Sequence, residues 1–146
     1  MNAKGETIFE KPSFREAAIH NRCIIYLNGF YEHHLLRVKH FRSIFIKKTT
    51  NHYHWPDFGV NGPMKKQGET RNTFSIVTTK GNKMLAKIHI KPKLEGPRMP
   101  VILSQELEDK WLNPNEDELD MKSVQELIKE YPDEELDAYT VRKLRG

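Results

Sequence analysis

Short runs of β-branched and aromatic residues constrain the fold of this 146-residue chain more than any other feature of its sequence. The clearest runs are residues 22–27, 43–46 and 73–78, and residues of these types favour extended strands. No apolar run approaches the roughly 20 residues that a membrane-spanning helix needs. The chain therefore has to bury its apolar residues in a core built partly from short strands, and its length is sufficient for one such core.

Helical patterns and turn residues separate these runs, so we predict an α+β fold without internal repeats. Asn28-Gly29 offers a turn after the first run. Further strands are expected in three places: residues 30–33, 99–103 and 137–141. Helices are expected in four places: residues 82–88, residues 123–129, and the segments that follow Ser13 and Ser104, which have the character of N-terminal caps.

Residues 50–71 are expected to form a long loop, because prolines and glycines interrupt them repeatedly. The interrupting residues are Pro56, Gly59, Gly62, Pro63 and Gly68. Residues 90–97 are expected to form a second loop for the same reason. Both loops would leave the strands as separate short segments.

Charge is distributed unevenly along the chain, although its net value is only +4. Residues 1–103 carry 18 Lys and Arg against 7 Asp and Glu, whereas residues 104–146 carry 6 against 13. A basic body favours a partner that bears phosphates, because Lys and Arg displace condensed counterions from nucleic acid. The alternative is that these charges only keep the surface solvated.

Cys23 is the single cysteine, so no internal disulfide framework is possible. A reducing, cytoplasmic setting is therefore expected. The chain also opens without the pattern of a signal peptide.

Four polar residues lie beside apolar strand or helix ends, where a solvated surface would not require them: Asn2, Glu32, His89 and Arg98. A carboxylate placed like Glu32 suits general acid–base chemistry. His89 can exchange protons near neutral pH, and Arg98 offers a planar fork for a phosphate or carboxylate. The spacing leaves two interpretations open: one shared active site, or a structural Glu32–Arg98 ion pair with His89 at a helix end.

A metal site is a third interpretation, and it would use four histidines: His33, His34, His52 and His54. His33 and His34 are adjacent in a predicted strand, so their side chains would point to opposite faces. That geometry does not favour joint coordination of one ion. We therefore expect no metal and no cofactor.

Four short motifs occur in order along the chain. They are Asn2-Ala3-Lys4-Gly5-Glu6-Thr7; Arg22-Cys23 with Gly29-Phe30-Tyr31-Glu32; residues 73–79; and residues 84–89 with 98–103. In this order they resemble the SOS response-associated peptidase (SRAP) family, the abasic-site processing proteins of bacteria and eukaryotes. The resemblance spans Asn2 to about Tyr139 and implies an α+β fold with a mixed, mostly antiparallel sheet or barrel core and short flanking helices. Residues 1–146 would then form a single partial domain with an acidic helical region at 104–146.

The resemblance also implies a mechanism and a role for each candidate residue. Family members bind single-stranded DNA and capture the ring-opened sugar of an abasic site through an N-terminal cysteine, whose amine and thiol together form a thiazolidine crosslink. Asn2 matches an asparagine near the cysteine and the sugar, Glu32 a glutamate that moves protons, and His89 a histidine that assists Schiff-base formation and crosslink reversal. Arg98 matches an arginine that contacts DNA phosphate. Lys4 stands where most members carry a second arginine; it supplies the charge but not the bidentate geometry.

The chain departs from the family pattern in ways that affect the expected activity. The family's nucleophilic cysteine and the segment that carries it are expected ahead of Asn2, and they are not in this sequence. Cys23 is not a substitute, because it matches a buried cysteine whose α-amine is locked in a peptide bond. His33 replaces a common tryptophan, and residues 57–62 only weakly match a family strand. The alternative function is a non-catalytic remnant that binds single-stranded DNA.

The resemblance also sets expectations for the setting of the protein. Its partner would be single-stranded DNA with abasic sites, and the peptidase activity in the family name would act on the protein's own initiator methionine. We expect a bacterial, cytoplasmic monomer that associates with the nucleoid at damage.

Overall fold

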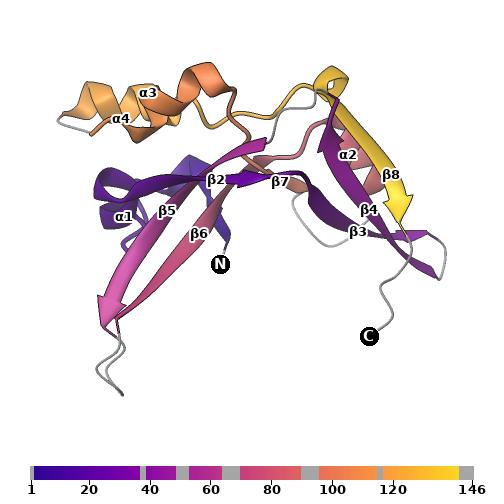
Figure 1. The fold of residues 1–146 in the computed structure, drawn as a ribbon, viewed down its shortest axis with the longest axis horizontal. Coiled ribbons are helices and arrows are strands. Elements are labelled where there is room, and N and C mark those ends of the chain that lie inside the picture. Colours follow the sequence, from indigo (N-terminus) through magenta and orange to yellow (C-terminus); the bar gives the residue numbers. More distant parts are fainter. Residues whose placement is uncertain are drawn as a thin grey trace.

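Two β-sheets form the frame of the protein (Figure 1). This computed structural model describes residues 2–36, 39–48, 53–63, 70–89, 96–114 and 117–141. The first sheet has the order β1-β6-β5-β2, with β7 also beside β6, and the second has the order β3-β4-β8. The strands of the first sheet are β1 (Asn2–Lys4), β2 (Arg22–Leu27), β5 (Tyr53–Pro63), β6 (Thr70–Lys80) and β7 (Arg98–Pro100). Those of the second sheet are β3 (Phe30–Leu36), β4 (Lys39–Lys47) and β8 (Leu136–Val141).

Short helices and 3-10 turns flank these sheets. The α-helices are α1 (Arg15–His20), α2 (Lys83–Ile88), α3 (Glu108–Leu112) and α4 (Glu118–Gln125). The 3-10 turns are η1 (Gly5–Thr7), η2 (Gln105–Leu107) and η3 (Asp133–Glu135). In Figure 1, α1, α3 and α4 lie on the side of the first sheet, where α1 contacts β5 and α3 contacts β2, whereas α2 contacts β3. The predicted α+β class with mostly antiparallel pairing is confirmed, since β1 with β6 is the one parallel pair among the described strands.

Two groups of buried apolar side chains pack against the sheets, and the second group also includes Met99 of β7 in the first sheet. Ala3, Val77 and Trp111 are fully buried in the group that serves the first sheet. Phe30 and Phe45 belong to the group that serves the second sheet, and their rings stack with centroids 4.8 Å apart. Burial of such apolar surface is the main favourable term in folding. The first group therefore anchors β1 through Ala3, and the second anchors β3 through Phe30.

The predicted loop over residues 50–71 is wrong, because β5 forms an 11-residue strand within it. This strand is hydrogen-bonded to β2 on one side and to β6 on the other, with Pro56 opposite Ile24 and Gly59 opposite Phe74. Proline and glycine weaken a strand locally, but pairing on both edges overrides that preference here. Residues 64–69 lie outside the described part.

Two predicted helix starts are also wrong. Phe14 occupies the N-cap of α1, so Ser13 does not cap it. The helix predicted at residues 123–129 instead begins at Glu118, because the Asp117 side chain accepts hydrogen bonds from the backbone of Leu119 and Asp120. Ser104 lies at the N-cap of η2 without a side-chain hydrogen bond.

Most of the other predicted strands and the helix at residues 82–88 agree with the structure. The strands predicted at residues 22–27, 43–46, 73–78 and 137–141 are present, as is the helix predicted at 82–88, which Asn82 caps. The strand expected at residues 99–103 ends at Pro100. Most of the loop expected at 90–97 lies outside the described residues. Within the described part of the chain, no helix has the length and apolar character needed to cross a membrane.

Candidate functional site: a cleft between the two sheets

A cleft of about 400 Å³ lies where the two sheets face each other. One wall comes from the first sheet and contains Asn2, Lys4, Ile76, Thr78, Arg98 and Pro100. The other wall comes from β3 and contains Phe30, Tyr31 and Glu32. Lys4 and Arg98 place two positive charges on one wall, and Glu32 places a carboxylate on the other.

The alternation of β1 brings two candidate residues into the cleft. Asn2 and Lys4 are exposed, whereas Ala3 between them is fully buried. This pattern follows from the strand geometry, in which successive side chains point to opposite faces. The parallel register of β1 with β6 places Lys4 opposite Thr78. An amide and an ammonium group therefore line the cleft from a three-residue strand whose central side chain is locked in the core.

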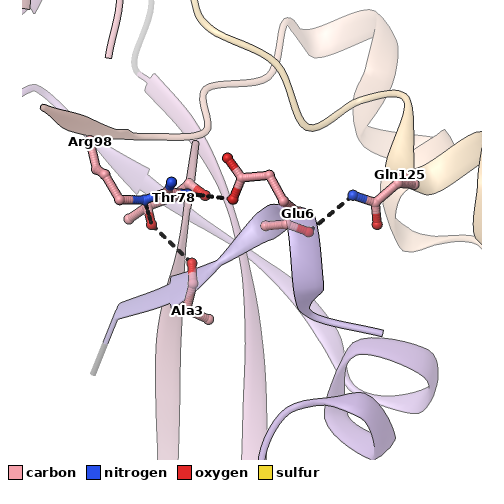
Figure 2. Close-up of polar contacts among 6 residues, drawn as sticks. Ala3, Glu6, Thr78, Arg98 and Gln125 are labelled. Atoms are coloured by element: carbon pink, nitrogen blue, oxygen red, sulfur yellow. Dashed lines mark hydrogen bonds and ion pairs between the residues drawn. The ribbon is translucent and has the colours of Figure 1, made fainter. Parts of the chain in front are cut away.

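Arg98 enters the same wall from β7, and its guanidinium is held by three hydrogen bonds (Figure 2). Its Nε donates to Thr78 Oγ1 at 3.2 Å, and its Nη2 donates to the Thr78 carbonyl oxygen at 2.6 Å. Nη2 also donates to Glu6 Oε2 at 2.6 Å. Charge-assisted bonds of this length are among the strong ones in proteins. Arg98 is thus fixed at the edge of the cleft rather than extended into solvent.

The pKa of Glu6 reflects this pairing. Partial burial raises it, but the hydrogen bond from Arg98 lowers it, as do a backbone hydrogen bond and the charges of Arg98 and Lys4. The net effect holds the pKa of the Glu6 carboxyl below its ordinary value. Glu6 is therefore an anion at neutral pH, and it pairs with Arg98 from outside the cleft lining.

Glu32 and His89 form a hydrogen-bonded pair on the opposite side. Glu32 Oε1 lies 2.8 Å from His89 Nδ1 and also accepts a hydrogen bond from the His33 backbone N–H at 3.1 Å. The side chains of Glu32 and His89 are only 20% and 10% exposed. His89 Nε2 is buried and has no hydrogen-bond partner among the described residues. A carboxylate hydrogen-bonded to an imidazole is an arrangement suited to proton transfer.

The structure brings together four of the five residues singled out in the sequence: Asn2, Lys4, Glu32 and Arg98 all line the cleft. His89 is not part of its lining and lies behind Glu32, to which it is hydrogen-bonded. The alternative of a Glu32–Arg98 ion pair is wrong, because Arg98 pairs with Glu6 and Glu32 pairs with His89. Sequence reasoning gave no role to Glu6 or Thr78, which hold Arg98.

The metal interpretation uses four histidines, of which only His33 has a side chain that the structure describes. The side chains of His34, His52 and His54 lie outside what the structure describes. Among the described residues, no group of three or more metal-ligating side chains comes together. Cys23 is partly buried in β2 rather than fully buried as expected, and it is not part of the cleft lining.

The mixed α+β fold thus places an amide, two cations and a carboxylate in the lining of one cleft, with an imidazole hydrogen-bonded behind the carboxylate. Residues 1–144 match the sequence model of the family described as SOS response associated peptidase (SRAP). The chain belongs to this family.

Relatives and solved structures extend the comparison. The chain is 36% identical over 148 residues to the abasic site processing protein YoqW of Bacillus subtilis and 35% identical over 148 residues to YoaM of the same organism. Each alignment covers 99% of this chain and 60% of the relative, so the chain spans less than two thirds of the length of these relatives. A crystal structure of a protein from Bacteroides thetaiotaomicron superimposes with a TM-score of 0.85 at 35% identity, over 97% of this chain and 58% of that one.

Proposed function

We propose that this chain forms the DNA-binding and proton-transfer part of a protein that captures abasic sites in single-stranded DNA. The observation that carries the proposal is the cleft, in which Asn2, Lys4 and Arg98 face Glu32 within a chain of the SRAP family. Relatives with the name abasic site processing protein support the same reaction class.

In this proposal the basic wall binds the DNA backbone. Lys4 and Arg98 lie on the same wall of the cleft and would each contact a phosphate. Arg98 adds fixed direction to its charge because its guanidinium is held in place. The abasic sugar, which has no base to fill the space, would enter between this wall and β3.

Glu32 and His89 would move the protons that the capture reaction requires. Opening of the sugar ring transfers a proton and generates an aldehyde, and an amine then adds to this aldehyde and releases one water. A thiol that adds to the resulting imine closes the thiazolidine ring. Glu32 lines the cleft and exchanges a proton with His89 through their 2.8 Å contact, so the two residues would act as one acid–base unit.

The amine and thiol would come from an N-terminal cysteine ahead of Asn2 in a longer protein. Cys23 does not fit this role, because it lies within β2, outside the cleft lining, and its amine is part of a peptide bond. We therefore expect this chain alone to bind abasic single-stranded DNA without forming an adduct that survives denaturing electrophoresis. A denaturant-resistant adduct with this chain would contradict the proposed chemistry.

Supplying the nucleophile separately tests the proton-transfer role with the chain as it is. Cysteine amide carries both an amine and a thiol and forms thiazolidines with aldehydes. We expect the chain to accelerate its reaction with abasic single-stranded DNA by about 10²-fold, the lower end of general acid–base effects. Glu32→Gln should abolish most of this acceleration while leaving DNA affinity within about twofold. Equal rates with the wild-type chain and without protein would overturn the proposal.

A non-catalytic single-stranded DNA-binding function is the second candidate, and the positive charges of Lys4 and Arg98 favour it. It predicts binding that weakens steeply with salt and that does not distinguish abasic from intact strands. Fluorescence anisotropy with both strands separates the two functions. Lys4→Ala should weaken binding, whereas Lys122→Ala, an exposed lysine on α4 outside the cleft lining, should not. Affinity that does not change between low and moderate salt would exclude this candidate.

A further inference from the structure

Two of the three guanidinium nitrogens of Arg98 donate hydrogen bonds within the protein, and the third does not. A guanidinium has five N–H donors, and three of them are used by Thr78 and Glu6 through Nε and Nη2. Nη1 makes no hydrogen bond to the described residues, and Arg98 lines the cleft with a side chain that is 31% exposed. The part of the guanidinium that remains for a ligand is therefore Nη1.

The Thr78 side of this arrangement is rigid. Thr78 is 6% exposed, and its hydroxyl donates to the Ala3 carbonyl oxygen at 3.0 Å while accepting from Arg98 Nε. Thr78 is paired with Lys4 of β1 on one side and Pro100 of β7 on the other. A hydroxyl that donates and accepts at the same time has a fixed orientation. Thr78 therefore sets where the Nε edge of Arg98 lies.

The Glu6 side is also anchored. Glu6 lies in η1, the turn that directly follows β1, and the carbonyl oxygen of its neighbour Gly5 accepts a hydrogen bond from Gln125 Nε2 at 3.0 Å (Figure 2). A Cβ atom at Gly5 would lie 2.3 Å from Ile128 Cγ2, so this turn packs closely against the segment that follows α4. The acidic C-terminal region thus fixes the backbone from which the Glu6 carboxylate reaches Arg98.

We propose that Glu6 is a positioning residue, which holds Nη2 of Arg98 so that Nη1 is presented to a DNA phosphate in the cleft. This inference rests on the proposed function, because it takes the phosphate as the ligand of Arg98. Glu6 itself is not part of the cleft lining and acts only through the arginine. With both Nη2 hydrogens engaged, Arg98 contacts the phosphate through Nη1 rather than through a two-nitrogen fork.

Removal of Glu6 is expected to change DNA affinity in the direction opposite to that expected from charge repulsion alone. Removing a carboxylate near an anion-binding site ordinarily strengthens anion binding, because a repulsive charge disappears. If Glu6 orients Arg98, its removal instead weakens binding, because the guanidinium loses its fixed direction. The amide of glutamine keeps an acceptor for Nη2 without the charge, so it separates orientation from repulsion.

The affinity of the chain for single-stranded DNA measures this sign. Glu6→Ala should weaken binding about fivefold, as expected for an impaired charged hydrogen bond, and Glu6→Gln should bind at least as tightly as wild type. Glu16→Ala is the matched control, because Glu16 is an exposed carboxylate that pairs with Arg15 at 3.5 Å on α1. It should leave affinity unchanged. Binding by Glu6→Ala that equals or exceeds that of wild type would overturn the proposal.

A second measurement reads the orientation of Arg98 without DNA, so that failure of the proposed function is recognisable. In ¹⁵N-labelled protein, the Arg98 Nη2 hydrogens, one of which Glu6 accepts, should exchange with water about tenfold faster in Glu6→Ala than in wild type, with Glu6→Gln close to wild type. Equal exchange in all three proteins would overturn the positioning role. If exchange changes as expected but wild type binds no DNA, the positioning role stands and the proposed ligand is wrong.

Discussion

Arg22 and Arg98 each donate several hydrogen bonds, but to different kinds of acceptor. Arg22 opens β2 and donates to four backbone carbonyl groups: Trp111 at 2.6 Å, Ala18 at 2.7 Å, Ile19 at 3.0 Å, and Asn113 through a short contact. Arg98 opens β7 and donates to one carbonyl, one hydroxyl and one carboxylate. All three guanidinium nitrogens of Arg22 donate hydrogen bonds, whereas Nη1 of Arg98 makes none to the described residues.

The position of the acceptors explains the difference. Those of Arg22 lie at the ends of α1 and α3, where the last carbonyl groups of a helix have no partner within the helix. Arg22 therefore joins two helices to the first sheet, and its guanidinium also lies 5.9 Å from the Trp111 ring centroid. Burial lowers the pKa of Arg22 despite the opposing charge of Asp120. Such an arginine has a structural role, whereas one with an unused donor edge in a cleft can bind a ligand.

The largest expected effect is on Arg22. Arg22→Ala should lower the free energy of unfolding by about 3 kcal/mol, because several helix-end carbonyl groups lose their donor at once. Urea denaturation followed by circular dichroism measures this. Arg15→Ala is the control, since Arg15 is 57% exposed and forms a surface pair, and its loss should cost less than about 0.5 kcal/mol. A decrease in the free energy of unfolding below about 1 kcal/mol for Arg22→Ala would show that Arg22 does not have this structural role.

The second effect concerns the turn that supports Arg98. Gly5→Ala should lower stability by about 2 kcal/mol, because the new Cβ would overlap Ile128 Cγ2 and lie 3.1 Å from the Thr78 carbonyl oxygen. Thermal and urea denaturation measure the loss. Adding Ile128→Ala opens the space, so the double variant should lose less than the sum of the two single variants. Additive losses would show that η1 is not packed tightly against Ile128.

Several strands of the two sheets were predictable from the sequence, but β1 and the pairing of the strands were not. The runs at residues 22–27 and 73–78 contain β-branched and apolar residues, and both form strands. The strand β5 was missed, because its prolines and glycines are local signals while its two partner strands are distant in sequence. Propensity describes a residue's neighbours along the chain and carries no information on which edges a strand will meet.

The same limit applies to the site. Asn2, Lys4, Glu32 and Arg98 could be singled out as polar residues beside apolar strands, or by family resemblance, and all four line the cleft. The Arg98–Glu6 pair joins residues 92 positions apart, and it forms because β1 and β7 flank the same part of β6. Only this register shows that Arg98 has a carboxylate partner and that Glu32 is left for His89.

Arg98 should show the opposite pattern from Arg22. Arg98→Ala should weaken single-stranded DNA binding about tenfold, which corresponds to about 1.4 kcal/mol, while the free energy of unfolding changes by less than about 1 kcal/mol. The slope of log affinity against log salt should fall by about 0.7, the value for one phosphate contact on a single strand. Anisotropy titrations at several salt concentrations measure both. If Arg98→Ala lost as much stability as Arg22→Ala and left the salt slope unchanged, Arg98 would have a structural role like that of Arg22 and no phosphate contact.

The smallest expected effect is on pH dependence, and it also separates the two arginines. Because the Glu6 pKa is lower in the folded chain than its ordinary value of 4.5, the Glu6–Arg98 pair contributes stability that is fully present above that value. This contribution is lost as the pH falls through the folded pKa, since protonated Glu6 no longer pairs with a cation. Its size should be about 0.5 kcal/mol or less, because the side chains of Glu6 and Arg98 are 48% and 31% exposed.

The difference in unfolding free energy between wild type and Glu6→Gln, measured from pH 7 to pH 3, isolates this contribution. It should be constant above about pH 5 and shrink below it, as the carboxylate of the wild type takes up a proton. The difference between wild type and Arg22→Ala should not shrink for this reason, because the acceptors of Arg22 are carbonyl groups that do not titrate. A pH-independent difference for Glu6→Gln would mean that the charge of Glu6 does not stabilise Arg98. Arg98 would then be held by hydrogen bonds whose strength does not depend on charge, as those of Arg22 are.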